Sequence, residues 1–134
     1  MNKNKDKKIL IIDDEREMVE ELTEILEREG YAIEVAFDGE EAIERFRDPG
    51  QDIGLVLLDV KMPKMSGVEV YRKIRKIDAH VPVIIVTGSF EKKHADQILK
   101  EGAHMVVSKP FEVEKLLRLI KKLRSEHLEL CKAY

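Results

Sequence analysis

The stretch Ile53–Gly67, IGLVLLDVKMPKMSG, constrains what this chain can fold into more than any other part of the sequence. Six apolar or small residues in a row end at one carboxylate, Asp59, and a loop that contains Pro63 follows. Such a run predicts a strand buried on both faces, which is typical of the centre of a parallel sheet. Because open α/β sheets bind ligands outside the carboxyl ends of their strands, Asp59 is expected at the binding edge.

The rest of the sequence alternates between strand and helix patterns. Four further segments, apolar or alternating, predict strands: Lys8–Asp13, Tyr31–Ala36, Val81–Val86 and His104–Val107. Apolar residues at helical spacing predict five helices, which run from Asp14 to Glu29, from Glu40 to Phe46, from Gly67 to Ile77, from Glu91 to Lys100 and from Glu112 to about Leu130. We expect Asp14 to cap the first helix and Ser66 to cap the third.

This alternation predicts an α/β fold in which right-handed crossovers build a parallel sheet covered by helices on both faces. The all-apolar first, third and fourth strands belong in the middle of that sheet. The alternating or short second and fifth strands belong at its edges. The strand order 2-1-3-4-5 satisfies both conditions, so we expect a flavodoxin-like, doubly wound (βα)5 sandwich.

Length and composition exclude several classes of protein. The 134 residues suffice for one domain with a real core, and no apolar run approaches the ~18 residues of a membrane span. The N-terminus, MNKNKDKK, lacks the apolar segment of a secretory signal, and the net charge of -3 argues against nucleic-acid binding. The single cysteine, Cys131, suits a reducing cytoplasm. We expect a cytoplasmic protein that binds neither membranes nor nucleic acid directly.

The carboxyl ends of all strands in a parallel sheet lie at one edge. Side chains that carry charge or a hydroxyl group reach that edge from four strands: Asp13 and Asp14, Asp59, Thr87, and Lys109. Neighbouring strands are about 4.8 Å apart, so the three carboxylates must crowd together. Crowded carboxylates need a proton or a cation between them, and an all-oxygen ligand set favours Mg²⁺.

Each of these residues also has an ordinary explanation. Asp13-Asp14 alone is more often a helix cap. Thr87 alone is a β-branched strand residue, and Lys109-Pro110 alone is a loop. All of these explanations would have to hold together, at four strand ends on one edge. A shared site is the better interpretation.

The pattern of these motifs resembles the receiver domain of two-component response regulators. The matching residues are Asp13-Asp14, Asp59 within DVKMPKMSG, Thr87-Gly88 and Lys109-Pro110-Phe111. The resemblance extends from about Lys8 to Leu123. It implies that a histidine kinase phosphorylates Asp59, and that the chain is a phosphoacceptor rather than an enzyme with an external substrate.

The resemblance also implies the ligands of a metal ion. Mg²⁺ is expected to be held by Asp14, Asp59 and the backbone carbonyl of Lys61, with Asp13 assisting through water. The ion would neutralise charge that develops on the phosphoryl oxygens.

Further residues are expected to contact or make room for the phosphoryl group. By resemblance, Lys109 supplies a positive charge to a phosphoryl oxygen and Thr87 supplies a hydroxyl hydrogen bond. Gly88 leaves space for the phosphoryl group, and Lys109-Pro110 is a candidate cis peptide. The family commonly has Tyr, Phe or His three residues before this lysine. This chain has Val106, so the loop 88–90 is expected to carry more of the switch.

The resemblance implies that phosphorylation rearranges the face made by the fourth helix, fifth strand and fifth helix. The expected partners are a sensor histidine kinase or phosphotransfer protein, an output domain or target, and a phosphorylation-dependent second copy. The family docks its kinase on the first helix, which makes Arg16 and Met18 candidate contacts. We expect a frayed basic arm over residues 1–7, the receiver domain over 8–124, and an extension of the last helix over 125–134.

Three alternatives concern function and context. A haloacid dehalogenase-type aspartyl hydrolase needs a second Asp two residues after the nucleophile, where this chain has Lys61. A flavin or nucleotide domain of this fold needs a phosphate-cradling loop after the first strand, where this chain has two carboxylates. Within the receiver interpretation, the chain ending at Tyr134 favours a stand-alone regulator or relay intermediate. The long last helix, which extends past Leu123, also fits a truncated connector, as in a fragment of a longer regulator or hybrid kinase.

Overall fold

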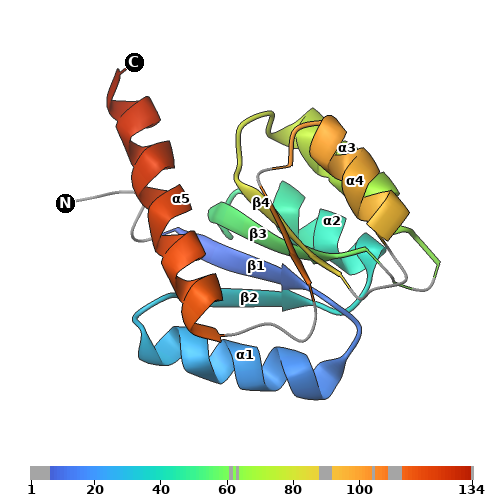
Figure 1. Cartoon of the computed structure of the whole chain (residues 1–134), viewed down its shortest axis with the longest axis horizontal. Helices are drawn as coiled ribbons and strands as arrows, with labels where there is room; N and C mark the ends of the chain where they lie inside the picture. Colours follow the sequence, from blue (N-terminus) through green and yellow to red (C-terminus); the bar gives the residue numbers. More distant parts are fainter. Residues whose placement is uncertain are drawn as a thin grey trace.

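The computed structural model describes residues 7–60, 62, 64–87, 92–103, 105–108 and 113–133. Within these residues, five strands and five helices alternate along the chain (Figure 1). Their bounds are β1 Lys8–Ile12, α1 Arg16–Arg28, β2 Ile33–Ala36, α2 Gly39–Arg47, β3 Ile53–Asp59, α3 Gly67–Ile77, β4 Val83–Thr87, α4 Lys92–Lys100, β5 Met105–Ser108 and α5 Val113–Ala133. No helix in the described ranges is both long enough and apolar enough to cross a membrane.

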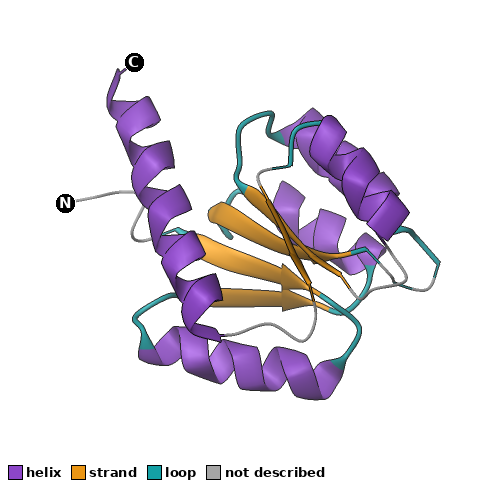
Figure 2. Ribbon diagram, in the orientation of Figure 1, coloured by secondary structure: helices purple, strands orange, loops and turns teal. Residues whose placement is uncertain are grey.

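The strands form one parallel sheet in the order β2-β1-β3-β4-β5, which confirms the expected strand order and fold class (Figure 2). Ile12 at the end of β1 pairs with Ala36 on β2 and with Leu58 on β3. Asp59, one residue later, pairs with Val86 on β4. The carboxyl ends of these four strands therefore lie together at one edge of the sheet.

Helices cover both faces of the sheet, with α1 and α5 on one face and α2, α3 and α4 on the other (Figure 1). Successive residues of the central strands point to opposite faces and enter two separate core clusters. The cluster beneath α2, α3 and α4 takes Leu10, Ile12, Val56, Leu58 and Ile85. The cluster beneath α1 and α5 takes Ile9, Ile11, Leu55, Leu57 and Ile84. This two-sided burial explains why β1, β3 and β4 carry unbroken apolar runs.

The starts of the helices test the expected caps. Ser66 caps α3 as expected, because its hydroxyl accepts a hydrogen bond from the Glu69 N–H at 3.3 Å. The expectation that Asp14 caps α1 is wrong. The cap position belongs to Glu15, whose side chain makes no capping bond, and the Glu15 N–H donates to Asp13 Oδ1 at 3.0 Å. An aspartate readily accepts from the N–H two residues later, so Asp13 fixes the turn that leads into α1, and α1 begins without a side-chain cap.

Two strands begin two residues later than the sequence patterns indicate. The N–H of Tyr31 donates to the Leu26 carbonyl at the end of α1, so β2 begins only at Ile33. Pro82 has no N–H to give to the sheet, although its carbonyl accepts from the Val56 N–H at 2.9 Å. As a result β4 begins at the residue after Pro82.

Candidate functional site

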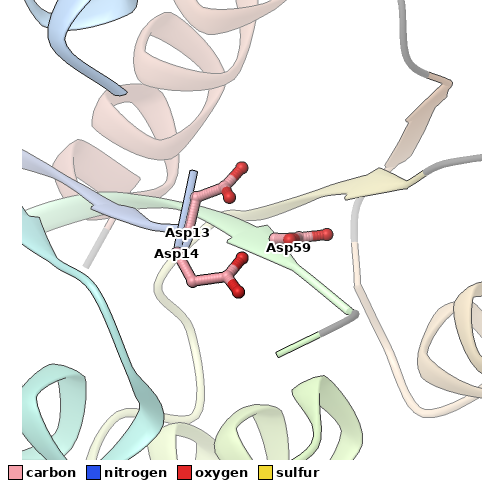
Figure 3. Close-up of side chains that lie close together, drawn as sticks. All are labelled: Asp13, Asp14 and Asp59. Carbon is pink, nitrogen blue, oxygen red and sulfur yellow. The ribbon is translucent and has the colours of Figure 1, made fainter. Parts of the chain in front are cut away.

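Three carboxylates meet at the carboxyl edge of the sheet (Figure 3). One oxygen of each of Asp13, Asp14 and Asp59 lies within 4.8 Å of the others. Asp13 and Asp59 are only 2% and 4% exposed, whereas Asp14 is exposed to solvent. The predicted crowding of the three carboxylates is therefore present in the fold.

The backbone of the sheet places each of these side chains. Asp13 continues from β1, and its N–H donates to the Ala36 carbonyl at 3.1 Å. Asp13 Oδ1 also receives the Glu15 N–H, which orients the carboxylate and starts α1. Asp59 is the last residue of β3, and strand pairing with Val86 fixes its backbone. Asp14 lies in the connection between β1 and α1.

The donor set fits a hard divalent cation. All three groups are carboxylates, and their oxygens are close enough to share one ion. Two of the groups are buried, where an ionised carboxylate is costly unless a positive charge or hydrogen bonds compensate it. Mg²⁺ prefers oxygen ligands and keeps several of its waters, which the solvent-facing Asp14 leaves room for. The residues present therefore suit Mg²⁺.

The other residues predicted for the site fall into two groups. Thr87 ends β4, one residue after the partner of Asp59, and pairs with Ser108 on β5. Val106 lies within β5 and pairs with Ile85. These pairings concern the backbone alone. Four further predictions lie outside the described residues: Lys61, Gly88, Lys109 and Pro110.

Two methionines that follow Asp59 pack against the core on the side of α2 and α3. Met62 and Met65 are partly buried there, against the cluster that contains Val60. The Gly67 N–H at the start of α3 donates to the Val60 carbonyl at 3.1 Å. In the sequence, Gly67 stands out only as the last residue of the DVKMPKMSG motif. Its glycine identity, directly after the capping serine, was the one signal of a close backbone contact.

The start of α1 beside the carboxylates forms a hollow of about 450 Å³. Arg16 and Met18, the two expected partner contacts, line it together with Glu15, Glu17 and Glu21. The Arg16 guanidinium lies 4.1 Å from the centroid of the Phe37 ring. This contact joins the start of α1 to the segment that follows β2.

A polar network that sequence reasoning missed links α3 to the end of α4. The buried Tyr71 hydroxyl accepts from Arg75 Nε at 2.9 Å and donates to the Glu101 carbonyl at 3.2 Å. Arg72 forms a two-bond ion pair with the Glu101 carboxylate, at 2.9 and 3.2 Å. The hydrogen bond from Arg72 lowers the pKa of Glu101, and the same bond raises the pKa of Arg72. Nothing in the local sequence pattern marks residues 29 or 30 positions apart as partners.

Comparison with known proteins identifies the family of the chain. Residues 9–121 match the model of the response regulator receiver domain. The chain is 40% identical over 113 residues to the uncharacterized transcriptional regulatory protein YkoG of Bacillus subtilis (strain 168), covering 84% of this chain and 49% of that protein. It is 38% identical over 121 residues to the transcriptional regulatory protein CpxR of Escherichia coli (strain K12), covering 90% and 50%. The chain thus spans about half the length of the curated relatives it matches.

Solved structures agree with this match. A response regulator receiver domain protein (CheY-like) from Methanospirillum hungatei JF-1 superposes with a TM-score of 0.86 at 32% identity, covering 92% of this chain and 97% of that one. A receiver domain protein from Clostridium thermocellum gives 0.82 at 32% identity, covering 95% and 98%. From its sequence, its sheet and its cluster of carboxylates, the chain belongs to the receiver domain family of two-component response regulators.

Proposed function

We propose that Asp59 accepts a phosphoryl group from the phosphohistidine of a sensor histidine kinase or of a phosphotransfer protein. The observation that carries the proposal is the convergence of two further carboxylates, Asp13 and Asp14, on Asp59, which is buried at the end of the central strand β3. Family membership supports it, because receiver domains are phosphoacceptor signalling domains and not enzymes of the ordinary kind.

The transfer itself needs one nucleophile and one leaving group. A carboxylate oxygen of Asp59 attacks phosphorus while the phosphorus–nitrogen bond of phosphohistidine breaks. The electron pair of the broken bond goes to the imidazole, and the product on Asp59 is an acyl phosphate. Burial of Asp59 limits the access of water to the reacting carboxylate. Small phosphodonors such as acetyl phosphate can supply the same group, with a phosphorus–oxygen bond breaking instead.

The chain's own residues hold the metal in this proposal. The direct ligands would be Asp14, Asp59 and the backbone carbonyl of Lys61, and Asp13 would assist through water. The hydrogen bond from the Glu15 N–H to Asp13 Oδ1 holds the Asp13 carboxylate in place beside those of Asp14 and Asp59. When bound, Mg²⁺ would supply positive charge beside the phosphoryl oxygens.

The fourth and fifth strands contribute the remaining groups. We assign Lys109 to a phosphoryl oxygen as a compact positive charge, and Thr87 to a second oxygen through its hydroxyl. Gly88 provides space for the phosphoryl group, and Pro110 shapes the backbone after Lys109. The position of Thr87 at the end of β4, one residue past the partner of Asp59, supports its part in this assignment.

The consequence of phosphorylation is a change of surface. We propose that it rearranges the face of α4, β5 and α5, with Val106 in place of the usual aromatic residue and the loop 88–90 carrying more of the change. That face then controls an output domain, a target protein or a second copy of the chain. The relatives are named transcriptional regulatory proteins, which favours an output in transcription.

We propose that residues 8–124 form the receiver unit, with residues 1–7 as an arm and 125–134 as an extension of the last helix. The match over residues 9–121 supports these limits.

Labelling with acetyl phosphate tests the phosphoacceptor assignment. The unaltered chain, incubated with acetyl phosphate and Mg²⁺, should gain one phosphoryl group by intact mass. Asp59→Asn should gain none, and chelation of Mg²⁺ should prevent labelling. The matched control is Asp52→Asn, which alters an exposed carboxylate at the other end of β3 and should label normally. Labelling of Asp59→Asn at the normal rate would overturn the assignment.

A further inference from the structure

The connection between Asp59 and α3 is closed by a contact that only glycine allows. Gly67 is the first residue of α3, and its N–H donates to the Val60 carbonyl at 3.1 Å. A Cβ atom at residue 67 would lie 2.5 Å from Val60 Cα, 2.9 Å from Val60 Cγ1 and 3.1 Å from the backbone oxygen of Asp59. Two of these three neighbours are backbone atoms, which no side-chain rotation can move away.

Neither Val60 nor the start of α3 can move away from this contact without disturbing the packing around it. Val60 is 2% exposed and belongs to the core cluster beneath α2, α3 and α4. On the other side, α3 is held by the buried side chains of Val68, Tyr71 and Ile74. Interiors are close-packed, so a side chain at residue 67 must displace the backbone of Val60 or lift the start of α3.

Displacement of Val60 reaches the carboxylate cluster directly. Val60 is bonded to Asp59, whose carboxylate oxygen lies within 4.8 Å of oxygens on Asp13 and Asp14. Mg²⁺ demands near-ideal octahedral geometry with short metal–oxygen distances, so small shifts of a ligand lower its affinity. Groups that orient a metal ligand without touching the metal typically change affinity by about 10- to 100-fold when they are altered.

We infer that Gly67 is a positioning residue for the carboxylate site. Its close contact with Val60 fixes the position of the backbone directly after Asp59 and thereby sets the affinity of the site for Mg²⁺. The inference rests on the proposed function, in that the three carboxylates must be the metal site. Gly67 itself touches neither the metal nor the phosphoryl group. It acts through Val60 and Asp59.

The test measures metal affinity and fold stability in one experiment. Urea unfolding is followed over a series of Mg²⁺ concentrations, so that the midpoint without Mg²⁺ reports stability and its concentration dependence reports the Kd. Gly67→Ala should raise the Kd by roughly 10- to 100-fold. The control is Gly102→Ala, where the backbone φ of 116° strains any side chain at the end of α4. Gly102→Ala should lose stability while its Kd stays within twofold of the unaltered value.

A second variant decides the matter if Gly67→Ala does not fold. Val60→Ala keeps the backbone contact but removes Val60 Cγ1, the one side-chain atom among the three neighbours. It loosens the packing that holds the backbone of Val60 in place, so it should also raise the Kd. Its control, Val81→Ala, truncates an equally buried valine of the same core cluster, just before β4 at the opposite edge of the sheet, and should leave the Kd unchanged.

The outcomes separate this inference from the proposed function. A normal Kd in Gly67→Ala, or in Val60→Ala where the first variant is unfolded, would overturn the inference alone. Failure of the unaltered chain to bind Mg²⁺ would overturn the metal site and the inference with it. A Kd that rises equally in the control variants would show that lost stability, rather than positioning, lowers the affinity.

Discussion

Arg72 and Glu101 form an ion pair that shifts the pKa of both side chains. Their two hydrogen bonds tie α3 to the residue that directly follows α4. The pair is exposed enough that water and salt screen it, so its contribution to stability is small. Because the pair needs an ionised Glu101, it should make the stability of the protein depend on pH.

Glu101→Gln should lower stability slightly at neutral pH, and this deficit should vanish in acid. The pKa of Glu101 is lower in the folded state than in the unfolded chain, so the carboxylate contributes stability above its unfolded pKa. That contribution is lost as pH falls through the folded pKa. Arg72, with its raised pKa, stays protonated throughout. Urea midpoints of the unaltered chain and the variant, compared from neutral to acidic pH, give the measurement.

Salt provides the control for this prediction. High salt should shrink the difference between the two proteins at neutral pH, because the pair is screened. A deficit of equal size in acid would mean that Glu101 stabilises the fold by some means other than its charge.

At the scale of elements, the helices begin in different ways. Asp38 caps α2, since its Oδ1 accepts from the Glu41 N–H at 2.8 Å. By contrast, Asp13 holds the N–H at the start of α1 while also belonging to the carboxylate cluster. The start of α1 and the carboxylate cluster therefore share one side chain, whereas the start of α2 is independent of the cluster.

Asp38→Ala should destabilise the protein by about 1 kcal/mol, because it removes the acceptor at the start of α2. Asp38→Asn is the matched control: asparagine caps helices about as well, so most of the stability should remain. Urea unfolding of the three proteins measures the difference. Equal stability of the alanine variant and the unaltered chain would show that the N–H of Glu41 finds another acceptor without loss.

At the scale of the whole molecule, the sheet itself makes the carboxylate cluster. Asp13 and Asp59 are far apart in the chain, and only the pairing of β1 with β3 brings them together. The unfolded chain has no such cluster. Mg²⁺ should therefore bind the folded state in preference and stabilise it, by about 2.7 kcal/mol at a concentration of 100 times the Kd.

Asp14→Asn should abolish the gain in stability that Mg²⁺ gives. In the absence of Mg²⁺ the variant should be at least as stable as the unaltered chain, because one of three mutually repelling charges is gone. Melting temperatures with Mg²⁺ and with a chelator measure both effects. Asp52→Asn is the control, since Asp52 lies at the other end of β3 with a φ of 46° that asparagine tolerates. An undiminished Mg²⁺ effect in Asp14→Asn would place the metal elsewhere.

Much of this molecule could be predicted from local patterns. The apolar run before Asp59 predicted a central strand, and two-sided burial of β3 confirms it. The strand order followed from which segments are wholly apolar. The prediction that Asp14 caps α1 is wrong, because the helix begins one residue later than the pattern indicates and its cap position, Glu15, makes no side-chain capping bond. The sequence pattern predicts a start of β2 that is two residues too early, because the pattern does not reveal that the Tyr31 N–H is bonded to the Leu26 carbonyl.

The sequence by itself determined the elements, their order in the sheet and the carboxylates at its edge. Hydrophobic periodicity and turn residues act over a few neighbouring positions, and both are written in the chain. Only the tertiary structure decided which atoms meet: the oxygens of Asp13, Asp14 and Asp59 within 4.8 Å, and Gly67 against Val60. Distances of this kind depend on packing between segments that are separate in sequence, and close packing settles them to a fraction of an ångström.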